Sequence, residues 1–255
     1  MTLRGMRARN NPLFMALLLA CHGLPAVAER LELAAANTWP TAYELNGRPT
    51  GVLVELVTEA YRRAGYRVTF KLMPWSRCLG EAKTGKVDGV FSTFRLPERE
   101  AFLYFTHEVL TVQVISLFVR RNSTLRNGND FVALQELRAG VIRETSYGTK
   151  FDDAVKTGAL RYVFPTDSIE TNLKMLMATR VDFIPSYRSV MLNTAKNLGL
   201  LGQIKELTPP LESVPSYLAF TRVKDRRKAA MDFDIALAAM KRDGTYQRIV
   251  ERTPY

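Results

Sequence analysis

The stretch Pro74–Thr106, PWSRCLGEAKTGKVDGVFSTFRLPEREAFLYFT, predicts three elements in close succession. Ser76 can cap a short helix, and Gly85 can end it because glycine tolerates the left-handed conformation. The apolar residues from Val87 to Phe91 predict a short buried strand. Pro97 suits the first position of the next helix. Helix and strand therefore alternate here, as they do in α/β proteins.

Polar side chains stand at the carboxyl end of the predicted strand. Ser92 and Thr93 end it, and Arg99 lies in the first turn of the following helix. Ligands of open α/β sheets bind beyond the carboxyl ends of the strands. The stretch therefore predicts half of a ligand cleft.

Several runs of the chain together resemble a known family. Gly85-Lys-Val-Asp-Gly89 with the hydroxyl residues after it, Pro97-Glu-Arg-Glu100 and Phe105-Thr106 resemble the first lobe of type II periplasmic solute-binding proteins, specifically the amino-acid-binding family three. Pro74-Trp-Ser-Arg77 is similar to the same region in one branch of that family. Upstream, Tyr43–Gly51 and the amphipathic run after it resemble the family's first strand, hairpin and helix.

The resemblance covers nearly all of the chain after residue 28. Gly140–Gly148 resembles the first strand and turn of the second lobe, and Met175–Asp182 resembles a helix and strand that follow. The resemblance implies an α/β fold of the type II periplasmic binding protein kind, with two lobes and two strands that cross a hinge.

Two β-rich runs are candidates for the crossing strands. They are Val112–Val119 and Tyr217–Phe220, each next to a polar or proline-containing loop. If they cross, lobe 1 consists of residues 29–115 and 217–255, and lobe 2 consists of residues 116–216. Two crossing strands imply a hinge between the lobes.

Two helices have patterns that predict their details. Asp167 with Glu170 predicts a start like a capping box for a helix of the second lobe. The segment 226–242 predicts an amphipathic helix with one apolar face. We expect this face to point inward with Met231, Ile235, Ala238 and Ala239.

The N-terminal segment has the order of a secretory signal. Basic residues without acids precede the apolar run Leu13–Ala20, and Ala26-Val-Ala28 stands before Glu29. We expect residues 1–28 to be a signal peptide that directs the protein to the periplasm. The alternative is cleavage before Cys21, which would leave a lipid anchor on that cysteine. No later apolar run approaches the roughly 20 residues that span a bilayer.

The composition is basic. The 36 lysine and arginine residues against 25 acidic residues give a net charge of +11. The basic residues are scattered among acids rather than gathered on one element, which argues against nucleic acid as a partner. A basic surface instead raises the local concentration of anionic ligands.

Removal of residues 1–28 leaves Cys78 and His107 as the single cysteine and the single histidine. One cysteine excludes an intramolecular disulfide, and these two residues do not make a typical zinc site. We therefore expect neither a metal nor a cofactor. Cys78 is expected to be a small buried hydrophobe, and His107 to be structural or on the surface.

The resemblance also implies ligand contacts in lobe 1. Arg99 stands where the family's arginine binds a ligand carboxylate, which a guanidinium matches with two hydrogen bonds. A surface ion pair with Glu98 or Glu100 is the alternative. Trp39 and Trp75 stand where related proteins hold the ligand between two aromatic residues, the alternative being a place in the core. Further contacts are expected from Tyr43, Ser92, Thr93 and Phe94.

In lobe 2, Thr145, Ser146 and Tyr147 precede a helix that begins near Gly148. Free N–H groups and the dipole of that helix would face an anionic group. Ordinary capping of the helix by Ser146 is the alternative.

Two positions depart from the family's pattern. Tyr187, itself a candidate contact, stands where the family has the acid that pairs with an α-ammonium. Ala36 stands where the family has the acidic residue that binds the basic side chain of a ligand. A standard α-amino acid would leave its ammonium unpaired on burial, which is costly. Either Glu144 substitutes or the ligand is not an α-amino acid, and lysine, arginine and histidine are expected to bind poorly.

The resemblance implies a function in solute binding. We expect a monomeric extracytoplasmic protein that closes around a small carboxylate-containing ligand, an amino acid or related organic acid, and delivers it to a membrane ABC transporter. An enzyme that resembles cyclohexadienyl dehydratases of the same fold is an alternative, although a histidine dyad and a metal cluster are missing from the sequence. A sensing module for a membrane signalling partner is the other alternative.

Overall fold

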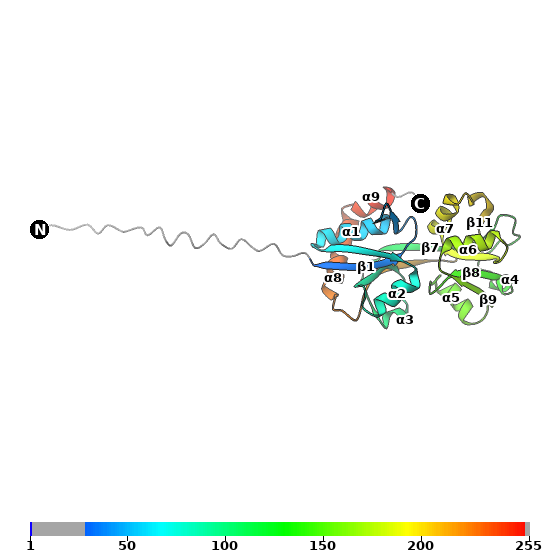
Figure 1. The fold of residues 1–255 in the computed structure, drawn as a ribbon, viewed down its shortest axis with the longest axis horizontal. Coiled ribbons are helices and arrows are strands. Elements are labelled where there is room, and N and C mark those ends of the chain that lie inside the picture. The colour runs from blue at the N-terminus through cyan, green and yellow to red at the C-terminus, as the bar shows by residue number, and fades with distance from the viewer. Residues whose placement is uncertain (2–28, 253–255) are drawn as a thin grey trace.

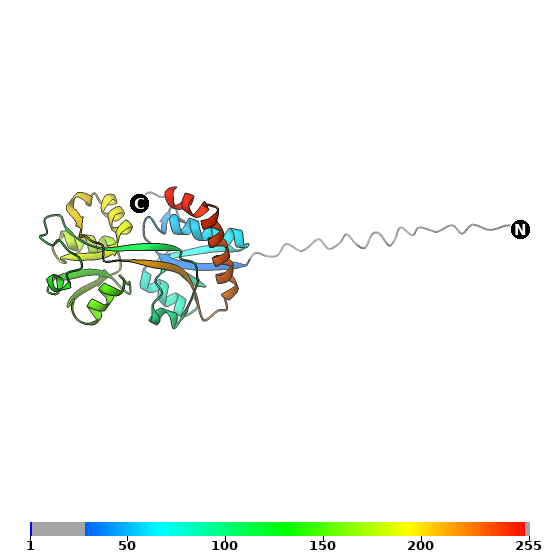
Figure 2. The same ribbon diagram turned by 180° about the vertical axis from the view of Figure 1, so that it is seen from behind.

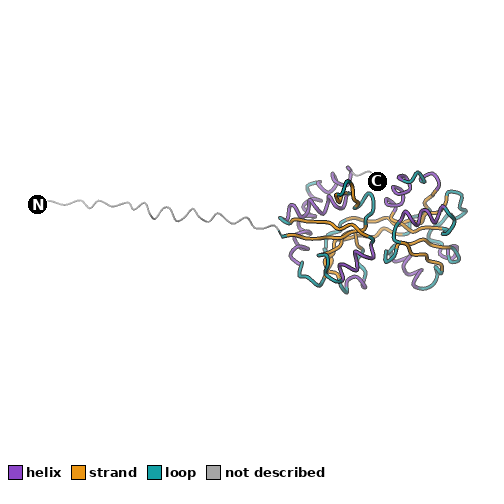
Figure 3. The backbone as a smooth tube through the Cα atoms, in the orientation of Figure 1, coloured by secondary structure: helices purple, strands orange, loops and turns teal. Residues whose placement is uncertain are grey.

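The structure, a computed structural model, describes residue 1 and residues 29–252. These residues form two lobes that lie side by side, each with strands at its centre and helices outside (Figures 1 and 3). The expected signal peptide and Cys21 lie outside the described residues. Within residues 29–252, no helix is both long and apolar enough to cross a bilayer.

Three parallel strands form the centre of each lobe. In lobe 1 the order is β4 (Arg67–Met73), β1 (Arg30–Ala36) and β5 (Gly89–Thr93). In lobe 2 the order is β10 (Phe183–Tyr187), β8 (Arg138–Ile142) and β9 (Tyr162–Thr166). Neighbours within each set pair in parallel, in agreement with the α/β class expected from the sequence.

Two long antiparallel strands, β7 (Thr111–Arg120) and β12 (Glu212–Thr221), join the lobes. Their first halves pair with each other. Beyond this shared part, β7 pairs with β10 in lobe 2 and β12 pairs with β5 in lobe 1. Each strand therefore runs from one lobe into the other, as neighbouring green and orange-brown ribbons in Figure 2. The expected lobe boundaries after residue 115 and before residue 217 fall inside these strands and stay a prediction.

The remaining strands are short. β6 (Leu103–Phe105) pairs with β12, and β11 (Ile204–Glu206) pairs with β7. A separate hairpin consists of β2 (Tyr43–Leu45) and β3 (Arg48–Thr50).

Helices cover both faces of each central sheet (Figure 1). In lobe 1, α1 (Val52–Ala64) lies on one face and α2 (Trp75–Lys83) on the other. In lobe 2, α6 (Ile169–Met177) and α7 (Arg188–Asn197) lie on one face and α5 (Thr149–Lys156) on the other. The shorter helices are α3 (Pro97–Glu100), α4 (Phe131–Leu134) and the 3₁₀ turn Leu201–Gln203.

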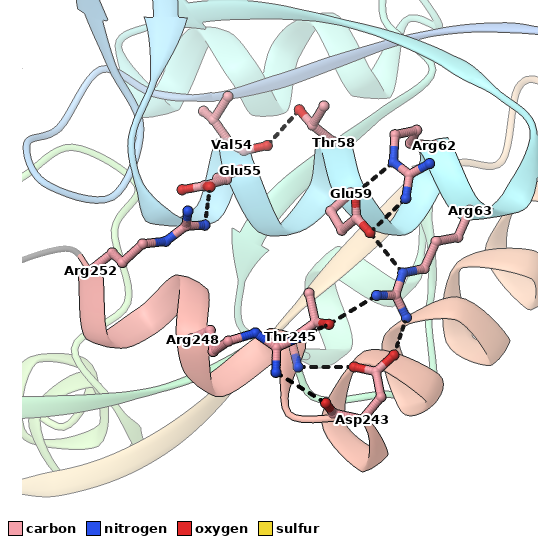
Figure 4. A network of polar contacts seen from close by, with 10 residues as sticks. All are labelled: Val54, Glu55, Thr58, Glu59, Arg62, Arg63, Asp243, Thr245, Arg248 and Arg252. Atoms are coloured by element: carbon pink, nitrogen blue, oxygen red, sulfur yellow. Dashed lines mark hydrogen bonds and ion pairs between the residues drawn. The ribbon is translucent and has the colours of Figure 1, made fainter.

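A polar network fixes the end of the described chain to lobe 1 (Figure 4). Helices α8 (Arg227–Arg242) and α9 (Thr245–Arg252) pack against α1. Arg63 of α1 donates to Asp243 and to Thr245, and Arg252 pairs with Glu55. These contacts hold both ends of α9 on the same helix.

The inward face expected for α8 is wrong. Met231 and Ile235 are 58% and 66% exposed, and the buried residues are instead Ala229, Ala230, Phe233, Ala236, Leu237 and Met240. Both stripes have helical spacing. The stripe with Phe233, Leu237 and Met240 is the one that packs against α1 and the core of lobe 1.

Two helix caps expected from the sequence are also wrong. α2 begins at Trp75, so Ser76 lies inside the first turn and caps nothing. In α6 the cap is Ser168 rather than Asp167, since the Ser168 hydroxyl accepts from the N–H of Thr171 at 3.2 Å. Asp167 and Ser168 have similar cap chemistry, and the helix begins where the Ser168 hydroxyl reaches the free N–H. The residue before α2 is Pro74, which makes no side-chain cap.

Cys78 and His107 have the positions expected from the sequence. Cys78 is fully buried in the core of lobe 1, and its thiol donates to the carbonyl of Met73 at 3.6 Å. His107 is exposed, and its backbone N–H donates to Asp234.

Candidate ligand-binding site

A cavity of about 340 Å³ lies between the two lobes. Its walls include a residue at the carboxyl end of five parallel strands, namely Ala36, Met73, Ser92, Ile142 and Tyr187. Open α/β sheets bind ligands at this position, because the strand ends leave a crevice between the loops that follow them. The carboxyl ends of the strands of both sheets therefore border the same cavity.

Arg99 lines the cavity and is 5% exposed. Its Nη1 donates to Thr93 Oγ1 at 3.2 Å and to the Phe94 carbonyl at 3.4 Å, and its Nη2 donates to the Glu144 carbonyl at 3.1 Å. Its guanidinium forms no ion pair with a carboxylate of residues 29–252. Burial lowers the pKa of Arg99, and carboxylates that do not contact it, such as that of Asp152, oppose this shift. The atoms that accept its hydrogen bonds are neutral oxygens.

The surface ion pair considered for Arg99 is wrong. Glu100 pairs instead with Arg95, with 3.6 Å between nitrogen and oxygen. The side chain of Arg99 is buried, and its guanidinium lies over the ring of Trp75. Arg99 is therefore a buried cation beside a cavity and not part of a surface pair.

Trp75 forms the wall next to Arg99. The guanidinium carbon lies 5.5 Å from the centre of the indole ring, within the range of a cation–π contact. The indole Nε1 donates to the Glu144 carbonyl at 3.1 Å. Trp75 is 8% exposed and also packs in the core of lobe 1 with Cys78 and Leu79. It therefore lines the cavity and belongs to the core at the same time, the two alternatives that the sequence left open.

The opposite wall is the turn between β8 and α5. Hydrogen bonds connect the residues of this turn. The hydroxyl of Ser146 donates to Asp152, the N–H of Tyr147 donates to the same carboxylate at 2.9 Å, and the Tyr147 hydroxyl accepts from the N–H of Ile142 at 2.7 Å. Gly148 is the residue before α5, with φ 84°. Thr145 and Tyr147 of this turn line the cavity.

Tyr147 and Tyr187 present neutral hydroxyl groups. Burial raises the pKa of Tyr187 to about 12 and raises the pKa of Tyr147 still further. The Tyr187 hydroxyl donates to the Ser146 carbonyl at 3.4 Å. Because both phenols stay protonated near neutral pH, they act as dipoles and not as counter-charges for Arg99.

The structure brings together six of the eleven candidate residues around the cavity: Trp75, Ser92, Arg99, Thr145, Tyr147 and Tyr187. Thr93, Phe94 and Ser146 are buried behind the wall, and Thr93 and Phe94 accept hydrogen bonds from Arg99. Trp39 and Tyr43 are outside the lining, with their ring centres 6.1 Å apart. The Glu144 carboxylate is exposed and also outside it, whereas its carbonyl meets Trp75 and Arg99.

Sequence reasoning missed several polar residues of the cavity wall, and two of them carried a signal. Gln113 is one of two polar residues in the β-rich run Val112–Val119 and is 5% exposed, and Ser186 is 3% exposed near the end of β10. A buried polar residue inside a strand requires a partner, so its position can indicate a site. The other missed residues are Asn37, Thr38, Thr41, Asp167, Ser168 and Glu170.

Comparison with curated proteins finds relatives over most of the chain. The chain is 23% identical over 223 residues to the probable amino-acid-binding protein YxeM of Bacillus subtilis, covering 86% of this chain and 81% of the relative. It is 23% identical over 215 residues to the putative amino-acid ABC transporter-binding protein PatH of Vibrio harveyi, covering 83% and 82%. Both relatives are named as binding proteins.

Solved structures share the fold. A histidine kinase sensor domain with similarity to periplasmic binding proteins matches with a TM-score of 0.78 and 19% identity, covering 89% of this chain and 96% of that one. An ancestral arginine-binding protein bound to glutamine matches with a TM-score of 0.75 and 22% identity, covering 88% and 97%. These similarities establish a type II periplasmic binding protein fold.

The family described as bacterial extracellular solute-binding proteins, family 3, matches residues 31–253. This match spans both lobes and both crossing strands. The chain belongs to the bacterial extracellular solute-binding proteins of family 3.

Proposed function

We propose that this protein closes its two lobes around a small carboxylate-containing molecule and presents it to the permease of a membrane ABC transporter. The observation that carries the proposal is Arg99, a buried guanidinium at the wall of an interlobe cavity without a carboxylate partner in the described chain. A buried charge without a counter-charge is costly, so the bound state gains when a ligand supplies the anion.

The proposed contacts come from both lobes. Arg99 would bind the carboxylate from lobe 1 with the help of Ser92, while Thr145 and Tyr147 approach from lobe 2. Trp75 and the neutral Tyr187 would contact the body of the ligand. A ligand that touches both lobes stabilises the closed arrangement more than the open one, and this difference drives the hinge motion.

The names of the relatives support transport. One relative is named as an amino-acid-binding protein and another as an ABC transporter-binding protein. A sensing role is the second candidate, since a histidine kinase sensor domain has the same fold over 89% of this chain. In either role the ligand would stay chemically unchanged in the cavity, and the membrane partner would recognise the closed form of the protein.

A thermal-shift screen of the ligand-free protein tests the ligand class. Amino acids, dicarboxylates and aromatic acids would be compared with their amides or esters of the same shape. A ligand at a hundredfold excess over its dissociation constant adds about 2.7 kcal/mol of stability. We expect hits among the acids only. Equal shifts from the neutral analogues would contradict the role of Arg99, and conversion of a hit into another compound would favour the enzyme.

Export to the periplasm is part of the proposal. The expected cleavage after Ala28 leaves Glu29 as the first residue of the mature protein. N-terminal sequencing of protein from the periplasm should therefore begin at Glu29. A blocked terminus with a lipid-bearing Cys21 would contradict this and would place the protein on a membrane surface.

A further inference from the structure

One backbone carbonyl accepts hydrogen bonds from two side chains of the opposite lobe. The Glu144 oxygen receives Nε1 of Trp75 at 3.1 Å and Nη2 of Arg99 at 3.1 Å. Trp75 begins α2 and Arg99 lies in α3, both in lobe 1, whereas Glu144 follows β8 in lobe 2. A carbonyl oxygen has two lone pairs, so this acceptor is fully used by the other lobe.

The turn that presents the carbonyl is held in shape by its own lobe. Glu144 has φ 56°, which places a residue other than glycine in the left-handed region. The N–H of Thr145 donates to the Ile142 carbonyl at 3.1 Å, and Asp152 accepts from the residues that follow. A residue other than glycine keeps a left-handed conformation only where the surrounding structure enforces it. The hydrogen bonds of the turn therefore fix the position of the Glu144 carbonyl before the other lobe contacts it.

The two donors depend on Glu144 to different degrees. Arg99 has two further acceptors in its own lobe, Thr93 and the Phe94 carbonyl, and keeps them if the lobes separate. Within residues 29–252 the indole N–H of Trp75 has the Glu144 carbonyl as its acceptor. If the lobes separate, this N–H must exchange its protein partner for water.

We infer that the Glu144 carbonyl is a clasp between the lobes that forms without ligand, and that Trp75 is the positioning residue that holds the second-lobe turn against Arg99. All three groups belong to the protein, so the clasp favours the closed arrangement before a ligand arrives. A ligand then binds to a form that is already populated, and less of its binding free energy is used for closure.

The test measures closure in the ligand-free protein, so its outcome does not depend on the proposed ligand. Spin labels on cysteines introduced at Lys86 in lobe 1 and Lys156 in lobe 2, both exposed, would report the distance between the lobes by double electron–electron resonance. The native Cys78 is buried and would not take up the label.

Trp75→Phe removes the indole N–H and keeps an aromatic ring beside Arg99. The matched control is Tyr246→Phe, which removes a donor to the Leu110 carbonyl, 2.9 Å away inside lobe 1. We expect the ratio of near to far lobe distances to fall roughly two- to tenfold in Trp75→Phe, the effect of one hydrogen bond, and to stay unchanged in Tyr246→Phe. Glu144→Ala keeps the carbonyl and should also leave the ratio unchanged.

Three results would overturn the inference: an unchanged distance distribution in Trp75→Phe, an equal change in Tyr246→Phe, or opening in Glu144→Ala, which would assign the contact to the carboxylate. If Trp75→Phe fails to fold, site-specific replacement of Trp75 by benzothienylalanine tests the same point, because it has the shape of tryptophan without the N–H. Wild-type distances from this isostere would likewise overturn the clasp.

Discussion

The guanidinium carbon of Arg99 lies 5.5 Å from the ring centre of Trp75, so the cation is held against an aromatic face with its ion-pairing capacity unused. The ring covers one side of the guanidinium and the Glu144 carbonyl occupies part of its edge. This arrangement keeps a positive charge in place at the cavity wall without neutralising it.

Replacement of Arg99 should separate ligand binding from folding. Arg99→Met keeps much of the buried stem and removes a charge that forms no ion pair within residues 29–252. We expect ligand-free protein to melt within a few degrees of the wild type, because a buried ion is often replaced by an apolar isostere at little cost. Loss of the ligand carboxylate's partner should cost about 2–5 kcal/mol, or roughly 30- to several-thousand-fold in dissociation constant.

Calorimetry with a carboxylate found in the thermal-shift screen measures this loss. Arg95→Met is the matched control, since Arg95 lies four positions earlier, pairs with Glu100 and is outside the cavity lining. Wild-type affinity in Arg99→Met would refute the carboxylate contact. A large loss of stability in the ligand-free variant would make Arg99 a structural residue instead.

Basic amino acids should bind poorly. Tyr187 and Ala36 line the cavity and carry no negative charge. The two acids of the lining, Asp167 and Glu170, are exposed to solvent, and Asp167 is paired with Arg143 at 3.3 Å. A cationic side chain would therefore share the cavity with Arg99 without a free buried counter-charge. Titration calorimetry with lysine, arginine and histidine tests this, and micromolar affinity for any of the three would contradict it.

The thiol of Cys78 should be inert in the folded protein. Burial raises its pKa to about 12, so almost no thiolate is present at pH 8, and the thiolate is the form that reacts. We expect no reaction with a disulfide reagent in buffer at pH 8 and complete reaction after unfolding in guanidinium. Rapid labelling of the native protein would mean that α2 opens locally.

Asp88 should stabilise the fold in a pH-dependent way. Burial alone would raise its pKa, but the Glu32 N–H at 2.7 Å and the cations of Lys224 and Arg226 bring the pKa below its ordinary value of 3.8. The stabilisation is therefore fully present above pH 3.8 and is lost as the pH falls through the lower folded value.

Urea unfolding of Asp88→Asn checks this expectation. We expect a loss of about 1–3 kcal/mol at pH 7, the range for a hydrogen-bonded charge, and a smaller difference from the wild type at pH 3. The exposed carboxylate of Asp153, replaced in the same way, is the control. An equal loss at both pH values would show that the variant disturbs packing and not an ion pair.

Much of lobe 1 followed from short-range rules. The expected left-handed turn at Gly85 has φ 72°, and Arg99 falls in the first turn of α3. The buried strand expected over residues 87–91 forms two residues later, at Gly89–Thr93. Each of these depends on the backbone conformation or the burial of residues a few positions apart. Information of this kind is present in the order of residues alone, and so are the motifs that indicated the family.

The opposing wall of the site was decided by tertiary structure. Glu144 lies 45 positions from Arg99 and 69 from Trp75, and it meets both through a backbone carbonyl, a group that every residue has. Its carboxylate, the feature visible in the sequence, is exposed. The sequence likewise did not decide which face of α8 is buried, because two apolar stripes had helical spacing. Packing against α1 determined which of them faces the core. The sequence determines which local shapes the chain prefers, whereas contacts between distant backbone groups exist only after the lobes have come together.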